Sequence, residues 1–374
     1  MALTVNNFVG FETGGLEEAN STSGAPSVQS TIVRSGTYAL LLAGAVTRAT
    51  YSILATISGG TGIYGFSFQT TTVIPTNNTD FFYVSDNLAT IVLRLRLNAI
   101  SGDVTLIDAN NVVVGTITAP FSANTWYYIE VAHTITTAEV FINGTSVLSV
   151  TAQDFYQEQT VVEFTFQGDN VATQDIYIDD VYAGQGTSSA DRLTSSVNVP
   201  RAYQNTAEDG TDVGDALATG TWAAVSETPT TTNAASYTAN PATGGTTTDE
   251  GTRLGPTGGP TLGTIKAAKW IHRLQRGTGA GTTHYKRYGN SGDGMTDEVV
   301  ALNTSYANYF TLSELTTVVP TPAESFQHGM RTAGAQDILS EEIWAFILNV
   351  TAAVPKSLPH ESPSPSSRAM LARF

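Results

Sequence analysis

The sequence contains no cysteine, which excludes disulfide bridges, thiolate zinc sites and cysteine nucleophiles. Charged residues are also scarce, at 13% of the chain, or roughly half of the ~25% that is usual. Lysine and arginine together number 17 against 33 acidic residues, which sets the formal net charge at −16. A field this negative argues against nucleic acid and against an anionic membrane surface as partners.

Long apolar runs are absent as well. The runs "YALLLAGAV" (38–46) and "IWAFIL" (343–348) fall short of the ~18 residues that a membrane-spanning helix needs. The N-terminus lacks the basic start and apolar stretch of a secretory signal. We therefore expect a protein made in a cytoplasm, with no membrane partner.

Threonine, serine, asparagine and glycine take the place of charge, and this composition suits strands and tight turns. In "VLRLRL" (92–97), Leu93, Leu95 and Leu97 alternate with two arginines, which indicates a half-buried strand. Asn143-Gly144 lies between two strand-like runs, where a type I′ hairpin turn prefers this pair. Turn signals recur about every ten residues, and they predict a sandwich of antiparallel sheets.

The organisation along the chain predicts an all-β protein with two antiparallel β-sandwich domains in tandem and an extended tail. We expect a jelly-roll-like domain over 1–186, a linker over 187–200, a second β-sandwich over 201–352 and a Pro/Ser-rich tail over 353–374. In the second domain, "IKAAKWIHRLQR" (265–276) and "DILSEEIWAFIL" (337–348) also admit a helix, although flanking glycines and aromatics favour a strand for the first.

The N-terminal half resembles a concanavalin A-like (LamG-like) jelly roll through "WYYIEVAHTITTAEVFINGTSVLSV" (126–150), "RSGTYALLLAG" (34–44) and "IYIDDVYAG" (176–184). The C-terminal half, through "NVPRAYQNTAEDGTDVG" (198–214) and the stretch 265–293, looks like a sandwich found behind such domains in structural proteins of tailed bacteriophages. This resemblance implies a virion component, located on the particle surface and assembled in the host cytoplasm.

Asp179 and Asp180 are adjacent carboxylates within a strand-like run. Strict alternation sends them to opposite faces, so they are not a converging acid–base pair, and Asp179 is expected to be the solvated one. The resemblance to carbohydrate-binding sandwiches pairs a "FE-x-G" motif with a late "DDV" around structural calcium. It therefore implies a calcium site at Glu12 and Asp180; the alternative is that both are ordinary loop-end residues.

One basic island, 266–287, interrupts the acidic chain. The functional interpretation is that Lys266, Lys269, Arg273 and Arg276 contact an acidic partner; the alternative, which the pattern favours slightly, is a solvated hairpin. The C-terminal "RAMLARF" mixes arginine with apolar side chains and suggests an anchor on a larger assembly. The anchoring residues predicted there are Arg368, Met370, Leu371 and Phe374.

No serine–histidine–acid arrangement and no glycosidase pair of glutamates is recognisable in the sequence. We therefore expect a non-enzymatic virion protein, a capsid decoration or head fibre, that forms a homo-oligomer such as a trimer, contacts other virion proteins and binds host surface glycan. The alternatives are a tail-fibre or receptor-binding lectin, which predicts an aromatic-lined face with Asn and Asp nearby, and a glycan-degrading enzyme, which predicts two carboxylates converging in a cleft.

Overall fold

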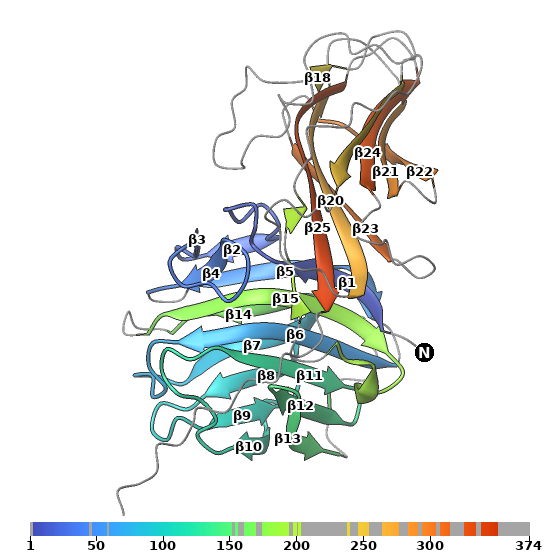
Figure 1. Ribbon diagram of the computed structural model, residues 1–374. Coiled ribbons are helices and arrows are strands. Elements are labelled where there is room, and N and C mark those ends of the chain that lie inside the picture. Colours follow the sequence, from blue (N-terminus) through green and yellow to red (C-terminus); the bar gives the residue numbers. More distant parts are fainter. Residues whose placement is uncertain are drawn as a thin grey trace, which may run out of the picture.

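The computed structural model describes most of the first half of the chain and the strands of the second half. The described residues are 3–44, 47–57, 60–151, 154–155, 161–169, 174–193, 197–199, 201–202, 238–239, 246–253, 264–276, 283–290, 294–303, 307–314, 325–333 and 338–350. Within them, the regular elements are strands and one 3-10 turn, η1 (Ser189–Asp191). Figure 1 shows the strands gathered into two lobes, which confirms the all-β class.

The first lobe is a sandwich of two antiparallel sheets, counted over the described residues. Sheet A has the order β13-β12-β11-β6-β15-β4-β3, with β1 also paired to β15, and sheet B has the order β10-β9-β8-β7-β14-β5-β2. The strands of sheet A are β1 (Thr4–Val9), β3 (Ser27–Gln29), β4 (Ala39–Leu42), β6 (Thr61–Thr70), β11 (Tyr127–His133), β12 (Ala138–Ile142), β13 (Thr145–Val150) and β15 (Ile176–Gly186). The strands of sheet B are β2 (Ser21–Ser23), β5 (Arg48–Ile57), β7 (Thr79–Asp86), β8 (Ile91–Leu97), β9 (Val104–Ile107), β10 (Val113–Ile117) and β14 (Val161–Gln167).

The core lies between the two sheets, as the alternating pattern predicts. On β8, Leu93, Leu95 and Leu97 are fully buried in the main apolar cluster, while the arginines between them lie on the other face. Aromatic rings from both sheets meet in the middle, and the ring centroids of Phe66 and Phe82 are 4.8 Å apart. Burial of this apolar surface is the main contribution to the stability of the lobe.

The hairpin predicted at Asn143-Gly144 is present. Asn143 and Gly144 join β12 to β13 with φ angles of 51° and 80°, the left-handed conformation that a type I′ turn requires. The side chain of Asn143 also accepts a hydrogen bond from the Tyr128 amide at 2.9 Å. Asn111 also has a positive φ, of 64°, in the turn between β9 and β10.

The second lobe contains two further antiparallel sheets within the described residues. One has the order β16-β25-β20-β23, with β17 and β18 also paired to β25, and the other has the order β19-β24-β21-β22. The strands of the first are β16 (Val197–Asn198), β17 (Arg201–Ala202), β18 (Thr238–Ala239), β20 (Thr264–Arg276), β23 (Ala307–Glu314) and β25 (Ile338–Val350). The strands of the second are β19 (Thr246–Arg253), β21 (Thr283–Asn290), β22 (Gly294–Val300) and β24 (Ser325–Ala333). Both segments that also admitted a helix are therefore strands, β20 and β25.

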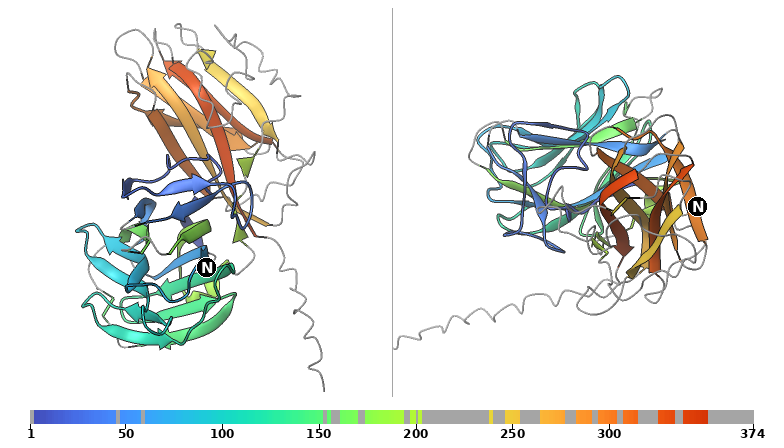
Figure 2. Two further views of the ribbon diagram at one scale, coloured as in Figure 1. Left: turned by 90° about the vertical axis from the view of Figure 1, so that its left-hand side faces the viewer. Right: turned by 90° about the horizontal axis from the view of Figure 1, so that it is seen from above.

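Strands β20 and β23 of the second lobe reach β1 of the first (Figures 1 and 2). The contact is apolar, because Ala267 and Ile271 of β20 belong to one buried cluster with Val5 and Phe8 of β1. Within the segment 187–200, expected to be a linker, the described residues Leu193, Val197 and Val199 are buried in the same cluster. That part of the segment therefore packs between the lobes instead of spanning open solvent.

Candidate functional site

Asp179 and Asp180 occupy a bulge in β15, and the bulge overturns the expectation that they face opposite ways. The pairing of β15 with β6 shifts register between Asp179 and Tyr182, and Asp180 has a φ of 49°. Before the bulge Ile176 and Ile178 face the core, and after it Val181 does, so the alternation moves by one residue. Both carboxylates are buried, with residue exposures of 1% and 0%, and the prediction that Asp179 is solvated is wrong.

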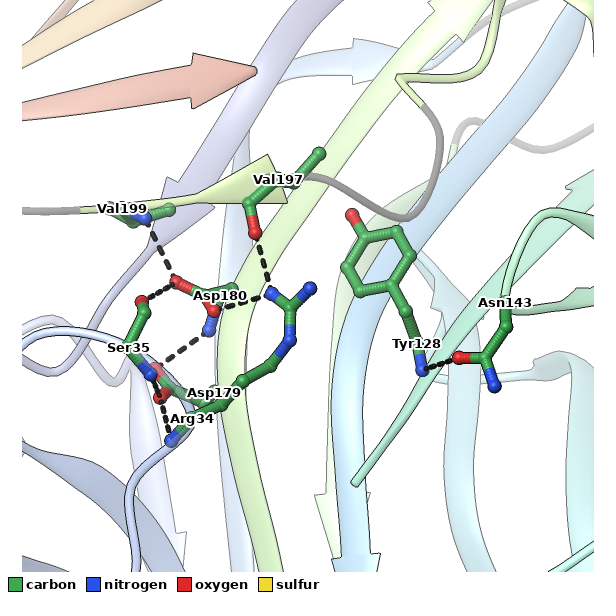
Figure 3. A network of polar contacts seen from close by, with 8 residues as sticks. All are labelled: Arg34, Ser35, Tyr128, Asn143, Asp179, Asp180, Val197 and Val199. Atoms are coloured by element: carbon green, nitrogen blue, oxygen red, sulfur yellow. Dashed lines mark hydrogen bonds and ion pairs between the residues drawn. The ribbon is translucent and has the colours of Figure 1, made fainter. Parts of the chain in front are cut away.

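The two carboxylates hold the loop before β4 and the segment that leads into the second lobe (Figure 3). Asp179 accepts hydrogen bonds from the backbone amides of Arg34 and Ser35 at 3.0 and 3.1 Å. Asp180 accepts from the Arg34 guanidinium at 2.7 Å, the Ser35 hydroxyl at 2.6 Å and the Val199 amide at 2.9 Å. The two aspartates therefore connect β15, the loop before β4 and the segment that leads into the second lobe. Their oxygens already accept hydrogen bonds from donors of the chain itself.

Arg34 is the cation of this network. Its Nη1 also donates to the Val197 carbonyl at 2.5 Å, and its guanidinium carbon lies 5.1 Å from the centre of the Tyr128 ring. Burial raises the pKa of Asp179 well above its usual range, and the nearby charge of Asp180 raises it further. The network is a buried contact between segments of the chain and not a surface open to a ligand.

Glu12, the other predicted calcium ligand, lies beside the same loop. Its carboxylate accepts hydrogen bonds from the amides of Thr37 and Tyr38 at 2.9 and 3.2 Å. Burial raises its pKa to about 7, and the charge of Asp180 adds to the rise. Gly36, with a φ of 66°, is required there because a Cβ would lie 2.1 Å from Glu12 Oε1.

A calcium ion at Glu12 and Asp180 would have to displace N–H donors that now point at these oxygens. Calcium takes six to eight oxygen ligands, and among the described residues no group of three or more His, Cys, Asp or Glu side chains is placed to hold a metal. The calcium site stays a prediction, and a calcium titration of folding stability tests it.

A second buried network covers the outer face of sheet A. The Tyr182 hydroxyl donates to Glu130 Oε1 at 2.6 Å and accepts from the Leu193 amide at 3.1 Å. Arg192 Nε donates to Glu130 Oε2 at 3.3 Å, and its guanidinium carbon stacks 3.2 Å from the centre of the Phe141 ring. These contacts fix the segment after β15 on this face, so the face is closed to a ligand there.

The basic island divides between the interior and the surface. Lys269 is 2% exposed at its side chain and forms an ion pair with Glu18, which is 5% exposed, in the loop after β1. Its Nζ also donates to the Phe8 carbonyl and, at 3.3 Å, to Asn7 Oδ1. The acidic partner that Lys269 meets in this structure is therefore the first domain of the same chain.

Of the other residues predicted to bind a partner, only those on β20 lie within the described part of the chain. Lys266 is exposed on β20, one residue before the buried Ala267. Arg273 and Arg276 lie on the same strand. In the backbone pairing of β20 with β25 they stand opposite Glu342 and Ile338. Arg368, Met370, Leu371 and Phe374 lie outside the described residues.

The outer face of sheet B is the face of the first sandwich that the junction leaves free among the described residues. Pairing aligns Arg94 of β8, Tyr83 of β7, Thr165 of β14 and Thr50 of β5 in one row across the sheet. Beside this row lie Arg96, Asp80, Glu163 and Arg48. The core-facing neighbours on each strand are apolar, so these polar side chains all point outward.

Hydrogen bonds order this polar face. Asp80 accepts from Arg96 Nε at 2.6 Å and from Arg94 Nη1 at 3.2 Å, and the Asp80 side chain is only 18% exposed. The hydroxyls of Thr50 and Thr165 are 2.9 Å apart. Glu163 accepts from the Asn20 amide nitrogen at 2.7 Å. These hydrogen bonds hold the polar side chains of this face in fixed positions.

The acidic residues of this face do not form a hydrolytic pair. Glu163 lies opposite Ser85 on β7, and Asp80 is five residues further back along that strand, about 16 Å away at ~3.3 Å per residue. Glycosidases place their two carboxyl groups within about 5–10 Å. These two groups therefore lack the geometry for that reaction.

The sequence places Arg94 and Arg96 on one face of a strand, but it does not show which other strands lie beside them. The alternation in β8 placed Arg94 and Arg96 on the face opposite the leucines. Arg48 and Tyr83 were missed, because nothing local shows that β5 and β7 flank β14 in one sheet. The order of the strands is a property of the tertiary fold.

Comparison with known proteins finds similar solved structures. No family model matches the chain, and no curated protein does. A cellulose-induced protein, Cip1, is 13% identical with a TM-score of 0.36, over 46% of this chain and 89% of its own. The ligand-binding domain of botulinum neurotoxin serotype D, solved with N-acetylneuraminic acid, is 13% identical with a TM-score of 0.34, over 46% and 43%.

The carbohydrate recognition domain of Emp47p is 8% identical with a TM-score of 0.35, over 50% of this chain and 97% of its own. Likeness at this level carries no information about ligand or reaction. Within the part of the chain that the structure describes, no helix has the length and apolarity to cross a membrane.

Proposed function

We propose that this protein is a non-enzymatic glycan-binding protein, and that its first domain binds saccharide on the outer face of sheet B. One observation carries the proposal. The described part of the second lobe and of the connecting segment packs on sheet A. The other sheet carries Arg94, Tyr83 and Thr50, all partly exposed, in one row, with the buried Thr165 between Tyr83 and Thr50. Sugars offer hydroxyls to such donors and an apolar ring face to an aromatic side chain such as Tyr83.

Binding by the full chain to a glycan array, followed by calorimetry on the strongest ligand, tests the proposal. We expect Tyr83→Ala to weaken that ligand about tenfold, which corresponds to ~1.4 kcal/mol. Tyr309→Ala, in the second lobe, is the matched control and should leave affinity unchanged. Absence of binding to any saccharide, or equal affinity of wild type and Tyr83→Ala, contradicts the proposal.

The non-enzymatic part of the proposal has its own test. It is supported by the wide separation of Asp80 and Glu163 on the free face. The best-bound oligosaccharide, incubated with the full chain and analysed by mass spectrometry, should be recovered intact. Appearance of shorter products that persists after repeated purification would point to a hydrolase.

The proposed setting is the surface of a tailed-phage particle, where the chain acts as a capsid decoration or head fibre, with a tail fibre as the rival location. The proposal is supported by the resemblance of the sequence to structural proteins of tailed bacteriophages. The buried Lys269–Glu18 ion pair, which connects the two lobes, agrees with a structural role. Deletion of 355–374 should abolish association with purified particles. Unchanged association would remove the tail from the attachment mechanism.

A further inference from the structure

The basic residues of the first domain are few and unevenly placed. The first 200 residues contain five arginines and no lysine, against 17 acidic residues. Arg34 and Arg192 pair with buried carboxylates at the junction between the lobes. The other three, Arg48, Arg94 and Arg96, all lie on the outer face of sheet B. In a chain with a net charge of −16, this face therefore carries a local positive excess.

The acidic residues on the face do not use up the guanidinium donors. Asp80 is shared by Arg94 and Arg96, and Glu163 is bound to Asn20. Nε of Arg48 and Nε of Arg94 are buried, yet neither has a hydrogen-bond partner in the described part of the chain. The Arg94 side chain is 16% exposed, so most of it is already removed from water.

A buried N–H group without an acceptor is unfavourable. The buried Nε atoms themselves are out of reach of a ligand, but they show that neither guanidinium is fully hydrogen-bonded within the described part of the chain. Both side chains are partly exposed, so an incoming acceptor would meet their exposed ends. The planar guanidinium matches the two oxygens of a carboxylate or sulfate through paired hydrogen bonds. A neutral sugar hydroxyl satisfies only one donor and brings no negative charge to the face.

We propose that the outer face of sheet B selects saccharides that carry an anionic group, a carboxylate or a sulfate, and that Arg48 and Arg94 bind those groups. This inference rests on the proposed glycan-binding function and names its ligand class. The row from Arg94 to Thr50 crosses three strand spacings, about 14 Å, with Tyr83 and Thr165 between its ends. That distance exceeds one sugar ring, so the ligand is an oligosaccharide.

Calorimetry with two matched ligand pairs tests the inference on the full chain. The first pair is trigalacturonate and its methyl ester, and the second is sulfated and unmodified cellotriose. We expect at least one charged member to bind ten times more tightly than its neutral counterpart. We expect Arg48→Gln to weaken that charged ligand about 10- to 100-fold, as for loss of a charged hydrogen bond. Added salt should weaken it too.

Lys266→Gln provides the matched control, because it removes the same charge from an exposed position in the second lobe. It should bind like wild type. The pair that shows the charge preference identifies carboxylate or sulfate as the anionic group, and either result supports the inference. Equal binding of charged and neutral members, with Tyr83→Ala still weakening both, overturns the inference and leaves glycan binding intact. Failure of all four ligands and of the glycan array overturns both proposals.

Discussion

Glu12 is predicted to make the stability of the first domain depend on pH, and Glu12→Gln should remove that dependence. The carboxylate is almost completely buried and accepts two backbone amides, and its pKa is raised to about 7 from an ordinary 4.5. Glutamine has nearly the same shape, and its Oε1 can still accept those two amides. The variant therefore removes the titration while keeping the local contacts.

The direction in which stability changes with pH depends on whether the folded or the unfolded state holds the proton more tightly. Between pH 4.5 and 7 the folded protein keeps a proton on Glu12 that the unfolded chain releases. The stabilisation is therefore fully present below pH 4.5 and is lost as pH rises through 7. The difference of 2.5 pKa units, at 1.36 kcal/mol per unit, corresponds to about 3 kcal/mol.

Urea unfolding of wild type and variant at several values between pH 4.5 and 8 measures the effect. We expect nearly equal free energies of unfolding at pH 4.5, and a variant that is more stable by up to ~3 kcal/mol at pH 8. A difference that does not change with pH would refute the reasoning. Repeating the pH 8 series with millimolar calcium tests the predicted metal site, because a bound ion at Glu12 and Asp180 would stabilise wild type and not the variant.

Two further predictions concern the junction and the loop. Lys269→Met should destabilise the fold by about 3–5 kcal/mol, because it leaves Glu18 buried without its counter-ion; thermal unfolding should show the double variant with Glu18→Leu recovering most of the loss, and no recovery would argue against the ion pair. Gly36→Ala should lower stability by about 1–3 kcal/mol because of its positive φ and the clash with Glu12, whereas Gly44→Ala, with a φ of 82° but open space around it, should cost less in the same assay.

Local signals predicted much of the fold. The Asn143-Gly144 pair specified a hairpin because few residues adopt positive φ without strain, and the leucine–arginine alternation specified a half-buried strand. β1 was missed, because five of its six residues are buried and alternation is hidden when both faces are covered. The choice between helix and strand over 338–350 was decided by pairing with β20, which lies more than 60 residues earlier.

The aspartates show why the candidate sites were harder to predict. An alternation argument assumes an uninterrupted strand, but the bulge at Asp179 and Asp180 is visible only against the register of β6. It turned an expected solvated residue into a buried one. Likewise, nothing near Lys269 in the sequence shows that its ammonium group ends beside Glu18, since the two residues are 251 positions apart.

The sequence by itself determined the all-β class, the absence of thiol chemistry and the positions of the tight turns, because pleat, turn conformation and composition act over a few residues. Only the tertiary structure decided which carboxylates are buried, where the second lobe attaches, and which sheet face keeps Arg48, Tyr83 and Arg94 together. Those outcomes depend on strand order and register, which are set by contacts between residues far apart in the chain.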